Sequence, residues 1–87
     1  MSKYKINELF NEVLIDDGIL FLSENTTNFY YLGEFESKLW QVIKEEPNNY
    51  EIMIERIMQL CKNFNFDEFE SFWNDLIYNQ IIMLEKA

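Results

Sequence analysis

Hydrophobic and polar residues change their spacing along this chain at about residue 32. Before that point there are three short apolar runs, at residues 13–15, 19–22 and 29–32, and we expect strands over residues 9–15, 19–23 and 29–32. Their β-branched and aromatic content is typical of half-buried strands. Asp16-Asp17-Gly18 separates the first two runs and predicts a tight hairpin, because glycine accepts the positive φ that such turns require. A polar loop over residues 23–28 leads to the third strand.

After residue 32 the apolar residues recur at helical spacing. Phe35, Leu39, Trp40 and Ile43 predict an amphipathic helix of about three turns, with Gly33 as its N-cap. The sequence Glu-Glu-Pro at residues 45–47 ends it, because the residue before a proline is driven out of the helical region.

Two further helices are expected. The second starts after Asn48 or Asn49 and ends at Asn63. The third opens at Asp67, whose spacing to Glu70 is that of a capping box, and runs to residue 78 or 79. Residues 80–84 form either a last helical turn or a short extended segment. The order predicts a single α+β domain over residues 1–87, a three-stranded antiparallel sheet followed by three helices, with residues 1–8 as a mobile or loosely attached arm.

Composition and charge narrow the classes of function. The chain is 48% apolar and 17% aromatic, which supplies the dense core that 87 residues need. Its longest apolar runs are far shorter than the ~20 residues of a membrane helix, and its start lacks the pattern of a secretion signal. With one cysteine, we expect a cytoplasmic protein. A net charge of −9 argues against nucleic-acid binding, and solubility is the plainest reason for it.

Catalysis is poorly supported by the residue types present. There is no histidine, the side chain best suited to proton transfer near neutral pH. Cys61 has only Lys62 as a basic neighbour in sequence, so nothing visibly activates its thiol. The chain has neither a glycine-rich phosphate loop nor a zinc-ligand pattern. We therefore expect no enzyme activity, no cofactor and no metal.

The third helix carries a broad apolar arc. Its members, spread over about 140° at 100° per residue, are Phe69, Phe72, Trp73, Leu76 and Ile77. In one interpretation the helix simply lies deep in a small core. In the other, one margin packs inward and the other lines a groove beside the sheet, in which case truncating Phe72 should cost little stability. Either margin would have an acidic rim: Glu68 and Asp75 beside Phe72, or Glu70 near Ile77.

The third strand is the other candidate. Three consecutive strands followed by helices leave one strand at an edge, where unpaired backbone groups can bind another chain. Its aromatic residues are either core residues or the bracket of a bound peptide. The candidate peptide-binding residues are Phe29, Tyr30, Tyr31, Leu32, Glu68, Phe69, Phe72, Trp73, Asp75 and Leu76.

Three stretches, VLIDDGILFL, FYYLGEFESKLW and FDEFESFWNDLIYNQIIM, together span about residues 13–83. In order and spacing the chain resembles the PqqD-like domains, also called RiPP recognition elements. It departs from the pattern at Gly33, where a capping Asn is more common, and at Asn79-Gln80, where a Gly is common. The resemblance implies a winged-helix-like fold in which the leader of a ribosomally made precursor peptide adds as a strand beside the third strand and against the third helix.

The resemblance also implies a partner. Such a domain delivers the precursor to a modifying enzyme, such as a radical SAM maturase, a cyclase or a protease, and this chain would be a free-standing version that acts in trans. The acidic third helix further predicts a leader with Lys or Arg near its apolar anchors.

Other readings remain open. A winged-helix DNA binder would need the basic face that the third helix lacks. An acidic inhibitor that mimics nucleic acid and blocks a basic cleft is the main alternative, and a homodimer through the same strand edge is a further possibility.

Overall fold

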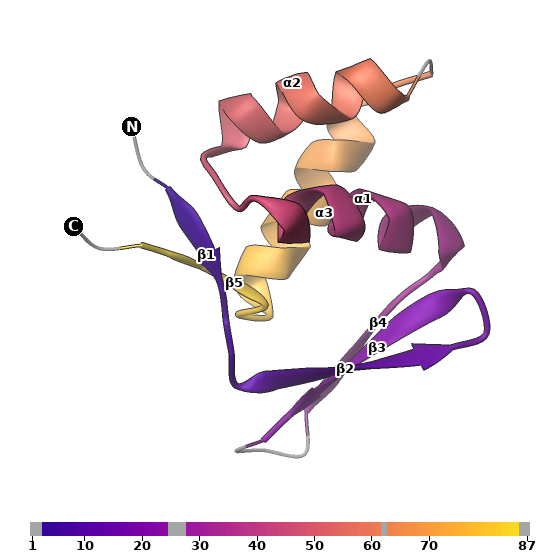
Figure 1. Cartoon of the computed structure of the whole chain (residues 1–87), viewed down its shortest axis with the longest axis vertical. Helices are drawn as coiled ribbons and strands as arrows, with labels where there is room; N and C mark the ends of the chain where they lie inside the picture. The colour runs from indigo at the N-terminus through magenta and orange to yellow at the C-terminus, as the bar shows by residue number, and fades with distance from the viewer. Residues whose placement is uncertain (1–2, 25–27, 62, 86–87) are drawn as a thin grey trace.

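The computed structural model describes residues 3–24, 28–61 and 63–85. Its elements in chain order are β1 (Tyr4–Ile6), β2 (Phe10–Ile15), β3 (Gly18–Ser23), β4 (Phe29–Leu32), α1 (Glu34–Glu45), α2 (Tyr50–Leu60), α3 (Phe66–Tyr78) and β5 (Ile82–Leu84). Figure 1 shows the three helices gathered on one side of the β2–β3–β4 sheet, with β1 and β5 side by side next to them. The expected α+β fold, a three-stranded antiparallel sheet followed by three helices, is confirmed. The expected loop over residues 23–28 lies partly outside the described residues.

The β2–β3 hairpin turns through Asp16 and Asp17. Asp16 takes the positive φ, 53°, which aspartate tolerates better than most residues. The expectation that Gly18 supplies this φ is therefore wrong. Gly18 serves close packing instead, because a Cβ at that position would collide with the carbonyl oxygen of Leu32 and with the ring of Tyr31.

The two ends of the described chain form a second, two-stranded sheet. β1 pairs antiparallel with β5, Tyr4 opposite Leu84 and Ile6 opposite Ile82. Buried Asn7 extends this contact, since its Nδ2 donates to the carbonyl oxygen of Gln80 at 2.8 Å. The expectation of a mobile or loosely attached arm over residues 1–8 is thus wrong for the residues that pair here, while residues 1–2 lie outside the described chain. Residues 80–84, left open between helix and strand, include the strand β5.

Capping explains where the helices begin. Gly33 caps α1 without a side-chain bond, and the Asn49 side chain accepts from the backbone N of Ile52 at 3.0 Å at the start of α2, as the sequence predicts. α2 ends at Leu60, earlier than the expected Asn63. α3 is capped by Asn65, whose side chain accepts from the backbone N of Glu68 at 3.1 Å, so the assignment of Asp67 as the cap is wrong.

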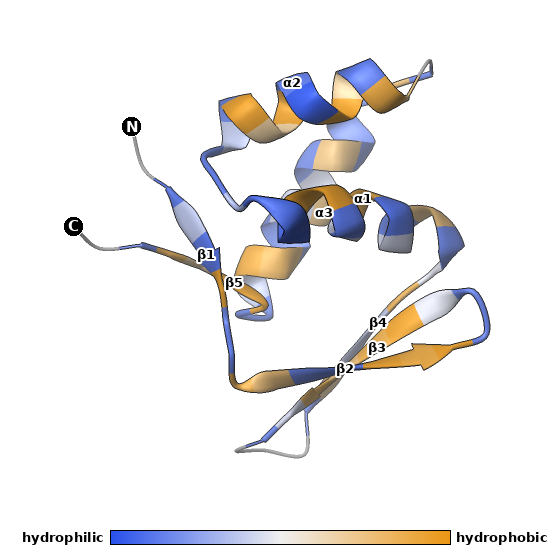
Figure 2. Ribbon diagram, viewed as in Figure 1, coloured by the Kyte–Doolittle hydropathy of each residue, from blue (hydrophilic) through white to orange (hydrophobic). Residues whose placement is uncertain are grey.

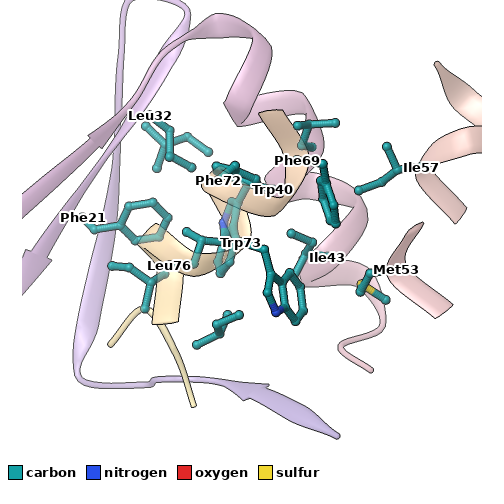
Figure 3. Packing of buried hydrophobic residues seen from close by; sticks show 14 residues of the cluster. Phe21, Leu32, Trp40, Ile43, Met53, Ile57, Phe69, Phe72, Trp73 and Leu76 are labelled. Atoms are coloured by element: carbon teal, nitrogen blue, oxygen red, sulfur yellow. The ribbon is translucent and has the colours of Figure 1, made fainter. Parts of the chain in front are cut away.

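The core lies between the sheet and the helices. Figure 3 shows Phe21, Leu32, Trp40 and Leu76 packed together from β3, β4, α1 and α3. The Trp40 ring meets the Phe21 ring edge to face at 5.1 Å, and its Nε1 donates to Glu12 Oε1 at 3.1 Å. α1 is thereby held against the sheet, next to the strand β4 from which it follows.

Hydrophobic residues are distributed along the elements rather than in one long run. Figure 2 shows them concentrated on β3 and on the part of β2 nearest the turn, and interleaved with polar residues along the helices. Within the described chain, no helix has the length and apolar character needed to cross a membrane.

Candidate functional site

β4 lies at one edge of its sheet. The strand order is β2–β3–β4, so among the described strands only β3 pairs with β4. Ser23 N donates to the carbonyl oxygen of Asn28 at 3.3 Å, so the residues Ser23 and Asn28 form a hydrogen-bonded pair of the antiparallel ladder. Hydrogen bonding alternates along an antiparallel pair, so Tyr30 and Leu32 bond to β3. The backbone N–H and C=O groups of Phe29 and Tyr31 then face the open edge, where another strand can bind them.

A cavity of about 430 Å³ lies beside this edge, between β4, the start of α1 and α3. We call it the β4–α3 groove. Its apolar lining comes from Tyr30, Tyr31, Leu32, Phe35, Leu39, Cys61, Phe64, Phe69 and Phe72, and its polar lining from Glu36, Asn65, Glu68, Ser71 and Asp75. An apolar hollow with a polar rim next to an open strand edge suits an extended peptide.

A second hollow, of about 710 Å³, adjoins the N-terminal end of β4. Phe29 lines it together with Tyr78 and Asn79 at the end of α3. Tyr30 lines both cavities, so surface hollows accompany β4 from its first residue to its last.

The charged groups that line the groove are all acidic. They are Glu36 on α1 and Glu68 and Asp75 on α3, and no described lining residue is Lys or Arg. Burial raises the pKa of the Tyr30 phenol, and the nearby charges of Asp75 and Glu36 raise it further. The acids therefore act on the side chain at the centre of β4, and a cation placed there would meet a negative potential.

The structure selects one margin of α3 for the groove. Glu68, Phe72 and Asp75 line it. Glu70, on the other margin, instead acts on Tyr50, whose pKa is raised first by burial and then by this charge. Phe72 is only 6% exposed and belongs to the core, so its ring is part of the groove wall and also a packing residue.

Seven of the ten candidate residues line the groove: Tyr30, Tyr31, Leu32, Glu68, Phe69, Phe72 and Asp75. Phe29 lies outside it, 68% exposed, at the adjoining hollow. Trp73 and Leu76 are buried in the core, so they support the groove from behind without forming its wall.

Sequence reasoning missed several lining residues. Phe35 shares the apolar stripe of α1 and was not among the candidate residues, yet it is 51% exposed and lines the groove. Phe64 lies in the α2–α3 connection, where no period signals its direction; its ring packs edge to face on that of Phe66 at 4.7 Å. Glu36 was likewise not among the candidate residues, although it lines the groove. Its position one turn before buried Trp40 was the available signal that it lies close to the sheet.

The chemical groups that line the groove are suited to binding a ligand. Cys61 contributes a half-buried free thiol at its α2 end. Over the described residues, no group of three His, Cys, Asp or Glu side chains is placed to hold a metal ion. What the arrangement presents is a row of open backbone groups, an aromatic hollow and three carboxylates.

Comparison with known proteins gives a match to a solved structure. That structure is TbiB1 in complex with the TbiA(beta) leader peptide; the TM-score is 0.70 over 95% of this chain and 96% of that chain, at 20% sequence identity. The two chains share a fold. No protein-family model and no curated protein matches the sequence.

Proposed function

We propose that this protein is a RiPP recognition element of the PqqD-like kind, which binds the leader segment of a ribosomally made precursor peptide by strand addition to β4. The observation that carries the proposal is the open edge of β4 beside an apolar groove of about 430 Å³. The shared fold supports it, since the TbiB1 structure holds a leader peptide.

In this proposal the backbone and the side chains have separate tasks. The outward N–H and C=O groups of Phe29 and Tyr31 hydrogen-bond to the leader, which supplies affinity without regard to sequence. Alternate leader side chains enter the groove, where Leu32, Phe35 and Phe72 select apolar anchors. The protein then hands the precursor to a modifying enzyme, such as a radical SAM maturase, a cyclase or a protease, and itself performs no chemistry. It acts in the cytoplasm, where precursors are made.

The acidic-inhibitor alternative makes a different physical prediction. Binding to a basic cleft would depend mainly on carboxylates and would fall steeply with salt. Strand addition depends on backbone hydrogen bonds, so most of the affinity should persist at high salt.

The test uses one position on the edge. Tyr31→Pro removes the outward N–H of residue 31 and leaves every hydrogen bond between β4 and β3 in place. Proline is tolerated on edge strands. Tyr31→Ala is the matched control, because it also removes the ring and keeps the N–H. The ligand is a synthetic candidate leader peptide, and its binding is measured by calorimetry and by amide shifts.

Tyr31→Ala should retain most of the binding, whereas Tyr31→Pro should weaken it at least tenfold, with both variants folded by circular dichroism. Amide shifts in the unsubstituted protein should centre on β4 and α3. Equal binding by the two variants, or shifts centred on the Asp16–Asp17 turn and α2, would contradict strand addition.

A further inference from the structure

The margin of α3 that lines the groove has an alternating order of side chains. Glu68, Phe72 and Asp75 follow one another along it, an acid on each side of an aromatic ring. At 1.5 Å rise per residue they lie at levels roughly 6 Å and roughly 4.5 Å apart. The two acids are exposed and the ring is buried, so the charges lie at the rim and the ring at the floor.

A peptide strand added to β4 has a matching period. Its side chains alternate between faces, and those on one face are about 6.6 Å apart. Peptide side chains that lie opposite Tyr30 and Leu32 point to the same face of the sheet as these two residues. On that face Leu32 points into the core and Tyr30 is half-buried beside the groove. Three successive inward side chains of the peptide would thus run along the levels of the α3 margin. Long flexible side chains at the outer two positions make up the difference in spacing.

The middle level accepts an apolar side chain. Phe72 forms its floor, and Leu39 of α1 and Leu32 of β4 adjoin it. All three are buried in the core, so this part of the wall is apolar. A polar side chain placed there would lose its water without gaining a partner.

The outer levels accept cations. At the lower one, Asp75 of α3 and Glu36 of α1 both line the groove together with Tyr30, and the charges of both raise the pKa of that phenol. At the upper one stands Glu68. The ion pairs found in the described part of the chain involve other acids, Glu12, Glu34 and Glu46. Groove carboxylates are therefore placed to meet positive charge from a ligand.

We infer that the segment bound in the groove has the pattern Lys/Arg–x–large apolar–x–Lys/Arg, the two cations meeting Glu68 at one end and Asp75 with Glu36 at the other. This inference rests on the proposed strand addition and specifies its substrate class. It identifies the α3 margin as the part of the site that reads sequence, while the β4 backbone supplies attachment.

The experiment is a selection that presumes no ligand. A displayed library of random 12-residue peptides is panned on the immobilised protein and, separately, on Tyr31→Pro to remove peptides that do not need the strand edge. Sequencing should show enrichment of basic residues two positions before and after a large apolar residue. In a synthetic member of the enriched set, exchanging both basic residues for Gln should weaken binding about tenfold, as expected for the loss of two exposed ion pairs.

A charge reversal with a matched control assigns the preference to residues. The variant E68K/D75K should select peptides with an acidic residue at the position that meets residue 68, and should lose the basic preference at the other position, where the lysine introduced at position 75 offsets the remaining charge of Glu36. The control E51K/E70K makes the same change in net charge. As in the test variant, both residues are exposed and one of them lies in the first turn of a helix, but neither lines the groove. It should keep the basic preference. Circular dichroism confirms that both variants fold.

Each outcome decides something. Enrichment that needs the strand edge but shows no basic preference, or a preference that E68K/D75K leaves unchanged, overturns the inference and leaves the proposed function standing. Enrichment that survives in Tyr31→Pro, or no enrichment over the bare support, overturns strand addition and the inference together.

Discussion

Phe72 and Phe35 both line the groove, but the protein covers them to different extents. Phe72 is 6% exposed and Phe35 is 51% exposed. Truncating a fully buried phenylalanine to alanine costs about 3–5 kcal/mol, so Phe72→Ala should lose about 3–4 kcal/mol of unfolding free energy. Half of the Phe35 side chain is already in water, and Phe35→Ala should lose about 1.5 kcal/mol. This differs from the expectation that a groove-lining Phe72 would tolerate truncation, because its ring also belongs to the core.

These losses are large for a domain of this size. At about 0.05–0.15 kcal/mol per residue, 87 residues have a total stability of about 4–13 kcal/mol. Each 1 kcal/mol lowers Tm by about 4–8 °C in small domains, so Phe35→Ala should melt about 6–12 °C below the unsubstituted protein and Phe72→Ala at least twice as far below it.

Urea and thermal unfolding followed by circular dichroism give both quantities. If Phe72→Ala does not fold, Phe72→Leu, which keeps most of the volume and should lose about 1–1.5 kcal/mol, retains the comparison. Leader binding should weaken in Phe35→Ala at 20 °C, where that variant is still folded. Equal destabilisation by Phe35→Ala and Phe72→Ala would refute the assignment of Phe35 to an open groove wall.

Three further predictions concern parts of the fold that hold the site. Trp40→Phe keeps a buried ring but deletes the bond to Glu12, and should cost about 1–2 kcal/mol; a double-mutant cycle with Glu12→Gln in urea should show that the two losses are not additive. The pKa of Tyr30 is raised in the folded protein, so the stability contributed by its neutral phenol is complete below pH ~10 and is lost as the pH rises through the folded pKa. Tyr30→Phe should therefore reduce the fall in Tm between pH 9 and 11.5 and remove one late step from the tyrosine titration followed at 295 nm. Asn7→Ala should cost about 2 kcal/mol, because the backbone groups of Leu9 and Gln80 each lose a bond, and an unchanged Tm would show that the bonds of Asn7 do not stabilise the fold.

Local patterns predict the elements whose causes are local. α1 and α2 begin where the sequence indicates, because Gly33, Asn49 and the proline at position 47 act on their immediate neighbours. Asn65 and Asp67 are both good caps, however, and only the folded connection decides which side chain reaches the open N–H groups at the start of α3.

Features that depend on contacts between distant parts of the chain could not be predicted from local sequence patterns. β1 and β5 have three residues each, too few to show a period, and each is a strand only because the other lies beside it. The groove margin of α3 depends on how the helix is rotated in the packed protein. Burial of Trp73 and Leu76 sets that rotation and turns Glu68 and Asp75 toward β4, whereas the sequence alone left both margins open.

The pairing of β1 with β5 has a consequence for the order of folding. It joins residue 6 to residue 82 and so closes a loop of nearly the whole described chain, at an entropic cost of about 4 kcal/mol before any contact is gained. The β2–β3 hairpin and the contacts of β4 and α1 with β3 close far shorter loops and can form earlier. We therefore expect β1 and β5 to join last in folding and to separate first. Because they form a sheet of their own, their separation leaves β4 paired with β3 and its outer edge unchanged.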